Sequence, residues 1–486
     1  MNGLKESAVR GGIAKLLGQA ATLIIRLCYL AVLARLLDPG DFGLVAMVTV
    51  VTGVFDLFTT AGLSSATVQK AQINEQQTSQ LFWINILVGC ALALLWAASA
   101  PFIADFYRDP RLFWIALAIA PAFLFNAAGV QHSALLQREL RYTTLTVIDT
   151  LTQIGSAVVG IALALNGYGY WALVIASLLC PAMNTACFWA ATRWIPDRPR
   201  RRAEIGSMLR FGGTITLNSL VVYIGYNIEK VLLGRFWGAD TLGIYTRAVQ
   251  LINLPVGSIS SAAGGVLFSV LSRLQDNPVQ YRSFFLKGYS LVLAATIPAT
   301  LFCAVYPYQI VMVVLGPNWT AAAPIFRMMV PAILVIGIIN PLSWLLLSSG
   351  LQKRSLHVAL VLAPLVMAAY LLGLRYGPGG VALSYSAVMV LWLLPHVAWC
   401  LHGTPVSVRD LARAIAGPLV SGVVAAACVF QMQRHFGVEL RPVLQLLVGG
   451  VAMTVIYGWI LIFLMGYREL YLGVIASLRQ PFRVNA

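Results

Sequence analysis

The chain has 486 residues, of which 59% are hydrophobic and only 10% are charged. Soluble globular proteins carry about 25% charged residues, so this composition excludes an ordinary soluble protein. The net charge of +16 does not indicate a nucleic-acid-binding protein, because the basic residues gather in short connections between apolar stretches.

Apolar stretches of membrane-spanning length recur along the whole chain. About 20 apolar residues cross a hydrocarbon core of about 30 Å as a helix, and no stretch shows the alternation of apolar and polar residues that membrane strands require. We therefore predict an all-α, polytopic membrane protein with about 14 transmembrane helices. The predicted spans are residues 11–36, 42–67, 80–104, 111–133, 143–166, 170–192, 211–235, 243–270, 284–306, 321–349, 355–375, 379–401, 411–432 and 442–466.

The basic residues are distributed unequally between the two sides of the predicted membrane. If both termini and every even-numbered connection share one side, that side carries 22 Lys and Arg residues and the other side carries 7. Basic residues collect on the cytoplasmic side, so both termini are predicted to be cytoplasmic. All seven cysteines fall inside predicted spans, and no disulfide, metal site or cofactor is expected.

The two halves of the chain share a short internal repeat. Residues 33–44 (LARLLDPGDFGL) align with residues 233–244 (LGRFWGADTLGI), each at the end of the first helix of a half and the start of the second. The shared residues are Leu33 and Leu233, Arg35 and Arg235, Gly43 and Gly243, and upstream Gly12 and Gly212. Six helices intervene, so the halves are predicted to share one orientation, as in parallel transporter repeats. The predicted domains are a six-helix lobe at 1–200, a second lobe at 201–405, and two accessory helices with a cytoplasmic tail at 406–486.

Four segments of the chain resemble the polysaccharide flippases of the Wzx type, which share the MATE-like MOP exporter superfamily with multidrug exporters and lipid II flippases. These segments are LARLLDPGDFGLVAM (33–47), FTTAGLSSATVQK (58–70), FYRDPRL (106–112) and LGPNWTAAAPIFRMM (315–329). The resemblance covers nearly the whole chain, including twelve core helices plus two. It implies a protein of the bacterial inner membrane that moves an oligosaccharide on undecaprenyl diphosphate from the inner to the outer leaflet. The product would serve capsule, exopolysaccharide or O-antigen assembly.

Arg26 stands in the middle of the first predicted span, where a charge costs about 2.5–3.5 kcal/mol on insertion scales. It lies on one helix face with other polar residues at helical spacing, namely Lys15, Gln19, Thr22 and Tyr29. The sequence leaves two interpretations of Arg26. It could pair with Asp56 of the second span as a structural contact, or its fork of donors could grip the phosphates of a substrate. We predict Lys15, Gln19, Thr22 and Arg26 as substrate-binding residues.

A second polar stripe follows the seventh span, where Tyr226 takes the position of Arg26 in the repeat. An aromatic face fits a sugar, which offers apolar ring faces and hydroxyl groups. We predict substrate contacts from Tyr223, Tyr226, Lys230 and Arg247. Ordinary packing between helices is the alternative for the tyrosines, and a side chain that reaches the membrane surface is the alternative for Arg247.

Three acidic residues inside predicted spans are candidates for ion coupling: Asp56, Asp149 and Glu229. Because no GxxxxGK[ST] phosphate loop occurs, ATP hydrolysis within this chain is not expected. A proton or sodium gradient acting through these acids, or the membrane potential acting on a charged complex, would supply the energy. Asp149 stands near the cytoplasmic end of its span, so an interfacial position is the alternative.

These features predict a flippase that works by alternating access between two lobes around a cationic cavity. The alternative is a MATE-type multidrug or cation antiporter, which would line its cavity with acidic and aromatic residues. A membrane glycan polymerase or ligase is disfavoured because the predicted outer connections are short, and we do not expect an enzyme. The expected partners are the lipid-linked oligosaccharide, membrane lipids, and a polysaccharide polymerase or glycosyltransferases, without nucleic acid.

Overall fold

The computed structural model describes residues 24–60, 74–197, 206–436 and 440–467, and every regular element in these ranges is helical. A helix covers residues 24–36 at the start of the described chain. The remaining elements are α2 (Pro39–Thr60), α4 (Glu75–Tyr107), α5 (Arg111–Ile119), α6 (Pro121–Arg138), α7 (Tyr142–Leu165), α8 (Tyr170–Thr192), α9 (Gly206–Arg273), α10 (Pro278–Val305), α11 (Pro307–Val314), η1 (Pro317–Trp319), α12 (Ala322–Ser348), α13 (Gln352–Leu374), α14 (Gly377–Leu401), α15 (Val408–Phe436), α16 (Pro442–Trp459) and the π-helix η2 (Ile460–Leu464). The predicted all-α class is confirmed.

Twelve helical stretches of the described chain are long and apolar enough to cross a membrane. The predicted fourteen spans agree with this number, because two of them are joined in α9 and the first is described only from residue 24. The break inside α9 falls at Gly238, whose φ of 81° and ψ of 179° are not helical. Glycine adopts this conformation readily because it has no Cβ, so a single residue separates the two spans.

The described chain divides into two compact units. Unit 1 comprises the chain up to Thr246 together with residues 314–318, and unit 2 comprises residues 247–313 and the chain from Trp319 onward. The predicted domain boundaries at residues 200 and 405 stay predictions. Unit 1 contains α2, α4 to α8 and the first part of α9, whereas unit 2 contains the rest of α9 and most of α10 to η2.

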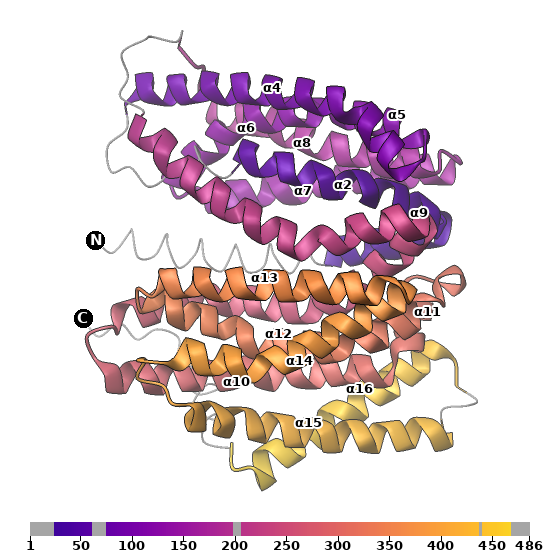
Figure 1. Ribbon diagram of the computed structural model, residues 1–486, viewed down its shortest axis with the longest axis vertical. Helices are drawn as coiled ribbons and strands as arrows, with labels where there is room; N and C mark the ends of the chain where they lie inside the picture. Colours follow the sequence, from indigo (N-terminus) through magenta and orange to yellow (C-terminus); the bar gives the residue numbers. More distant parts are fainter. Residues whose placement is uncertain (1–23, 61–73, 198–205, 437–439, 468–486) are drawn as a thin grey trace. The chain divides into compact units, whose positions relative to one another are not determined.

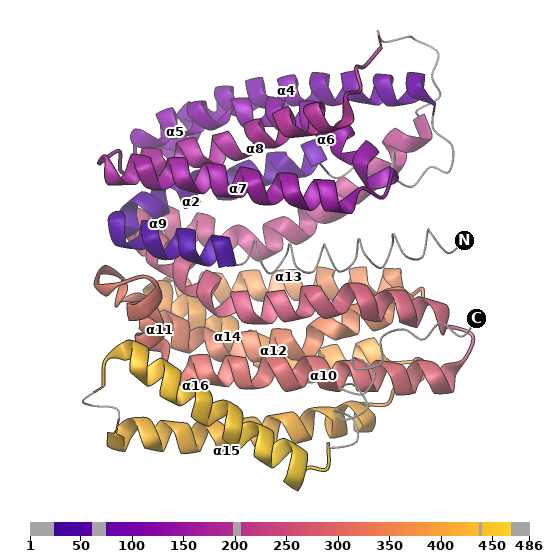
Figure 2. The ribbon, with the colours of Figure 1, turned by 180° about the vertical axis from the view of Figure 1, so that it is seen from behind.

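In unit 1, the neighbouring helices α4 to α8 pack side by side, with α6 between α4 and α8, as both ribbon views show (Figures 1 and 2). Trp96 of α4 is fully buried, and its indole N–H donates to the Ala116 carbonyl of α5 at 2.7 Å. Phe55 of α2 and Phe123 of α6 meet this indole with ring centroids 5.2 Å and 5.9 Å away. This aromatic core joins four helices of the unit and holds α2 in place.

The repeated glycines of the sequence form a reciprocal crossing inside unit 1. A Cβ on Gly43 of α2 would overlap the backbone of Ala239 in α9, and a Cβ on Gly243 would overlap the backbone of Pro39. The two contacts are equivalent, because Gly243 and Ala239 stand 200 positions after Gly43 and Pro39 in the repeat. We call the contact of residues 39–43 with residues 239–243 the glycine crossing. Its backbones approach so closely because glycine removes the side chain on both sides.

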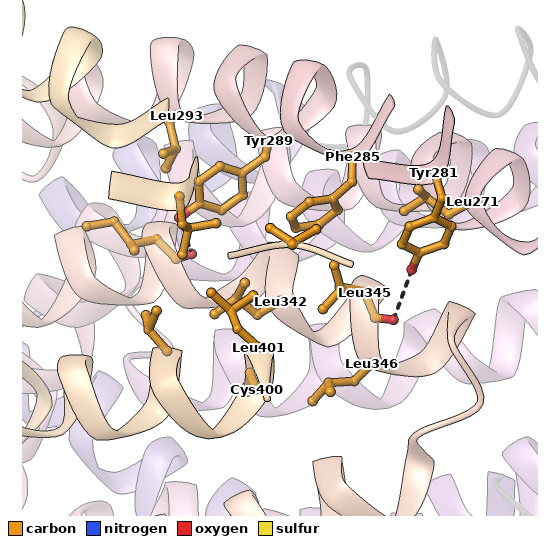
Figure 3. Close-up of a cluster of buried hydrophobic side chains, with 14 of the residues drawn as sticks. Leu271, Tyr281, Phe285, Tyr289, Leu293, Leu342, Leu345, Leu346, Cys400 and Leu401 are labelled. Atoms are coloured by element: carbon orange, nitrogen blue, oxygen red, sulfur yellow. Dashed lines mark hydrogen bonds between the residues drawn. The ribbon is translucent and has the colours of Figure 1, made fainter. Parts of the chain in front are cut away.

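Unit 2 has a separate core in which α10 packs between α12 and α15. Figure 3 shows its buried side chains, including the stacked rings of Phe285 and Tyr289 of α10, whose centroids lie 5.6 Å apart. At one end of this core, the Tyr281 hydroxyl donates to the Leu345 carbonyl of α12 at 3.1 Å and lies 2.6 Å from the Ser348 hydroxyl. The buried Tyr281 hydroxyl is therefore satisfied where α10 meets α12.

Candidate functional site

Arg26 lies in the helix of residues 24–36, and its side chain is exposed. Its Nε–H donates to the Oε1 of Gln153 in α7 at 3.3 Å. An arginine directed at lipid would meet no polar group, because hydrocarbon offers no acceptor. The contact with Gln153 therefore places Arg26 against a polar face of a neighbouring helix in the same unit.

The polar face of α7 continues from Gln153 to Asp149, one helical turn away. The charges of Arg26 and Asp149 attract each other, and the Cys180 thiol of α8 lies within the field of both. Among the described residues, the ion pairs closer than 4.0 Å do not include Arg26 with Asp149. The attraction thus acts without direct contact, and Asp149 is exposed. We name Arg26, Asp149 and Gln153 the Arg26 site.

Two further contacts hold the helices that carry this site. Tyr29, one turn beyond Arg26, packs against Gly160 of α7, where an added Cβ would stand 2.6 Å from the tyrosine hydroxyl oxygen. Behind α7, the Thr152 hydroxyl donates to the Asn184 side chain of α8 at 2.8 Å. The helix of residues 24–36 is thereby held close to α7, and α7 is held to α8.

The structure does not pair Arg26 with Asp56 within the described residues. The hydrogen-bond partner of Arg26 is on α7, whereas Asp56 of α2 is half-buried and lies within the electrostatic reach of Tyr223 in α9. The first of the two interpretations of Arg26 therefore finds no support in its contacts. The other predicted residues of its stripe, Lys15, Gln19 and Thr22, lie outside the described residues.

Two of the predicted residues of α9 in unit 1, Tyr223 and Lys230, are hydrogen-bonded to other residues of the unit. The Tyr223 hydroxyl donates to the Val50 carbonyl of α2 at 3.0 Å, and Lys230 donates to Asn227 at 2.6 Å. Tyr226 is 42% exposed, so its ring is available on the surface of α9. Glu229 is 95% buried, since only 5% of it is exposed. The α9 stripe thus combines a fixed tyrosine, an available one and a buried acid.

Arg247 begins unit 2, away from the residues of the Arg26 site along the chain. It is half-buried, and its Nη1 donates to Gln250 one turn further on. Gln153 is not among the residues that the sequence assigned to the site. The only signal for Gln153 was its helical spacing of four residues from Asp149.

The described residues contain no candidate metal site. Within the ranges that the structure describes, no three His, Cys, Asp or Glu side chains gather in a way that could hold a metal ion.

A multi-pass helical fold with ionisable residues on its spans is typical of membrane transporters. The chain belongs to the family of polysaccharide biosynthesis proteins, whose sequence model matches residues 32–324. It is 24% identical over 395 residues to the lipopolysaccharide biosynthesis protein WzxC of Escherichia coli (strain K12), covering 80% of each chain. It is 23% identical over 456 residues to the succinoglycan biosynthesis transport protein ExoT of Rhizobium meliloti (strain 1021), covering 91% of this chain and 90% of that one.

Solved structures share the fold. The inward closed conformation of the lipid II flippase MurJ matches with a TM-score of 0.76 and 16% identity, over 95% of this chain and all of that one. An inward-facing multidrug resistance MATE transporter of the MOP superfamily matches with a TM-score of 0.65 and 14% identity, over 80% of this chain and 97% of that one. The resemblance to Wzx-type proteins of polysaccharide biosynthesis is confirmed, and the solved structures confirm the fold.

Proposed function

We propose that the protein is a flippase that moves an undecaprenyl-diphosphate-linked oligosaccharide from the inner to the outer leaflet of the bacterial inner membrane. The transported unit would enter capsule, exopolysaccharide or O-antigen assembly. The proposal is supported by the membership in the polysaccharide biosynthesis family together with an exposed arginine on a predicted span. Both termini are proposed to be cytoplasmic, in keeping with the distribution of basic residues.

The single observation that carries the proposal is that Arg26 is exposed and bonds to Gln153 through Nε. Its guanidinium has five N–H donors, and the one on Nε is engaged by Gln153. The two Nη groups form the end of the fork that binds phosphate oxygens in pairs. A diphosphate gives such a fork several oxygens at once, and Lys15, Gln19 and Thr22 of the same predicted face would add further donors.

The sugar would be recognised by the α9 stripe. Tyr226 is exposed and offers a ring on which the apolar face of a sugar can stack, whereas Tyr223 is fixed to α2 by its hydroxyl. Lys230 and Arg247 would add charged donors for hydroxyl or phosphate oxygens. These four residues remain proposed contacts of the oligosaccharide.

Transport would follow alternating access, with the diphosphate and sugar enclosed by protein while the prenyl chain stays in lipid. This route avoids exposing hydroxyl and phosphate groups to hydrocarbon, where each unsatisfied polar group costs several kcal/mol. Coupling to an ion gradient would act through Asp56, Asp149 or Glu229. A polysaccharide polymerase or glycosyltransferases would be functional partners, since they produce or consume the transported molecule.

A MATE-type cation antiporter is the second candidate, favoured by the shared fold of a multidrug MATE transporter. A cation carrier needs acidic groups that face its ligand. In the Arg26 site the acid Asp149 faces a fixed cation instead, which repels an organic cation. The sign of the charge at this site favours the flippase.

A gene deletion with complementation separates the two candidates. Loss of surface polysaccharide with unchanged drug sensitivity, restored by the wild-type gene, is the expected result. Purified protein in vesicles should also make a lipid-linked oligosaccharide from the inner leaflet accessible to a lectin outside, unlike protein-free vesicles. Undiminished surface polysaccharide together with raised drug sensitivity would establish the exporter instead.

A further inference from the structure

The Arg26 site has a geometry that substrate binding alone does not require. Gln153 holds the Nε side of the guanidinium, and Asp149 stands one turn along α7 on the same helix face. An acid on the helix that positions the cation therefore attracts it without contacting it. A structural ion pair would bring the two charged groups into contact, and they are not in contact.

The surroundings of Asp149 contain few other charges. Within the described residues, the titratable groups that interact with Asp149 are Arg26 from the helix of residues 24–36 and Cys180 from α8. The neighbouring polar groups of α7 and α8, Thr152 and Asn184, are bonded to each other. Arg26 is thus the described cation whose field reaches Asp149.

We propose that Asp149 is the internal counter-ion of Arg26, and that a bound diphosphate takes its place and causes Asp149 to bind a proton. This inference rests on the proposed function, because it assumes that Arg26 contacts the diphosphate. A diphosphate diester brings two negative charges to the guanidinium and removes the field that kept the carboxylate ionised. One carboxylate oxygen of Asp149 then accepts one proton from water, and no covalent bond to the substrate forms.

Gln153 acts in this scheme as a positioning residue. Its side-chain oxygen accepts from Nε and so holds one edge of the guanidinium against α7, while the Nη1 and Nη2 end of the fork is the part proposed to meet a phosphate. A neutral amide performs this task without competing for the charge. A carboxylate at the same place would form a direct ion pair with Arg26 and compete with the substrate.

Reciprocity follows from linkage between the two binding events. If diphosphate binding favours proton binding at Asp149, then proton binding favours the diphosphate by the same factor. The affinity for the diphosphate should therefore rise as the pH falls through the titration of Asp149. A proton gradient could then bias loading of the site on one side of the membrane and release on the other.

The test uses the purified full chain in lipid nanodiscs and farnesyl diphosphoglucose as the probe. This probe is a diphosphate diester, so it lacks the second phosphate proton that titrates near pH 6 in monoesters. Calorimetry in two buffers of different ionisation enthalpy measures both the dissociation constant and the number of protons bound with the probe. The variants are Asp149→Asn, Gln153→Glu and Arg26→Ala, with Glu139→Gln as the control that removes an acid outside the site.

We expect wild type and Glu139→Gln to take up a proton with the probe and to bind it more tightly as pH falls. Asp149→Asn should show no proton uptake and should bind about fivefold or more tightly at neutral pH, the lower range of typical couplings. Gln153→Glu should bind more weakly at neutral pH and recover in acid, which provides a second test if Asp149→Asn fails to fold. In the Arg26→Ala background, Asp149→Asn should give no gain.

The outcomes distinguish the inference from the function on which it rests. If Arg26→Ala binds the probe as tightly as wild type, Arg26 is not the phosphate contact and that part of the proposed function fails. If Arg26→Ala weakens binding while Asp149→Asn keeps wild-type affinity and proton uptake, the counter-ion role of Asp149 is refuted and the phosphate contact stands.

Discussion

Two regions of unit 1 are built from opposite chemistry. The glycine crossing brings α2 and α9 together backbone against backbone, without space for a single methyl group. The Arg26 site instead has an exposed arginine on the helix of residues 24–36 and an exposed aspartate on α7, with one hydrogen bond from the arginine Nε to Gln153. Both regions join a helix from the start of the chain to a later one.

The contrast indicates which contacts determine the fold and which are available to a ligand. Close backbone packing leaves no freedom, because interiors respond to added volume with strain. An exposed arginine contributes little to stability, since exposed polar contacts contribute at most about 1 kcal/mol. Substitutions in the crossing should therefore impair stability and transport together, whereas substitutions in the Arg26 site should impair transport alone.

The largest effect is expected for Gly43→Ala in the glycine crossing. The new methyl group would overlap the Ala239 carbonyl, and backbone cannot move aside as a flexible side chain can. We expect a cost above the usual 1–3 kcal/mol of overpacking, seen as a lower melting temperature in detergent and loss of transport. Gly257→Ala is the matched control, because open space surrounds that helical glycine. Equal melting temperatures for the two variants would show that the crossing is not rigid.

Arg26→Ala should have the next largest effect, and on transport only. Hydrogen bonds to a charged group contribute about 1.5–3 kcal/mol, so transport should fall by about tenfold or more. Arg26→Lys should be intermediate, because an ammonium lacks the fork geometry. Leaflet transfer in vesicles and the melting temperature are measured together, with Arg141→Ala as an exposed control. A large fall in melting temperature for Arg26→Ala would contradict the contrast between the two regions.

A smaller effect, on both stability and transport, is expected at Gly160 of α7, where close packing lies next to the Arg26 site. In Gly160→Ala, the added Cβ would stand 2.6 Å from the Tyr29 hydroxyl oxygen and 3.1 Å from the Ala176 Cβ, so the Tyr29 ring or the helix that carries it must shift. We expect a melting temperature lower by a few degrees and a severalfold loss of transport. The control is Gly155→Ala in the same helix, where the flexible end of Met183 can yield. Equal behaviour of both variants would argue against close packing at Tyr29.

The smallest effect is expected for a charged pair outside both regions. Asp109 pairs with Arg111 at 2.7 Å, and the hydrogen bonds from Arg111 lower the pKa of the Asp109 carboxyl. A lowered pKa means that the stabilisation is present above the ordinary pKa of aspartate and is lost as pH falls through the lowered value. At neutral pH, the free energies of unfolding of wild type and Asp109→Asn should differ by less than about 1 kcal/mol, which melting temperatures would show as a small shift. The difference should vanish in acid, and its growth in acid would contradict the assignment.

The helices of this protein follow directly from the hydrophobic lengths of its sequence. Apolar stretches must be helical in a membrane because every backbone polar group needs an internal partner. Breaks were harder to locate, because they depend on single residues. The span at 111–133 is interrupted between α5 and α6 before Pro121, and α9 continues through two spans except at Gly238.

The candidate site was only partly predictable. Helical spacing showed which face of the first helix carries Arg26, but spacing does not tell which neighbouring helix covers that face. Asp56 of the second span was one of the two predicted partners of Arg26, whereas the hydrogen bond that the structure describes is made with Gln153, 127 residues later. The sequence shows the repeat at Gly43 and Gly243. It does not show that the two copies of the repeat contact each other, which only the structure reveals.

The glycine crossing also has a consequence for biosynthesis. Residues 39–43 meet residues 239–243, so the contact cannot form until about half of the chain has left the ribosome. Chains fold from the N-terminus as they are made, and the early spans must therefore wait in the membrane for their partner. A truncated gene that ends before residue 239 would leave those spans without it, and we expect such a fragment to be removed by proteases.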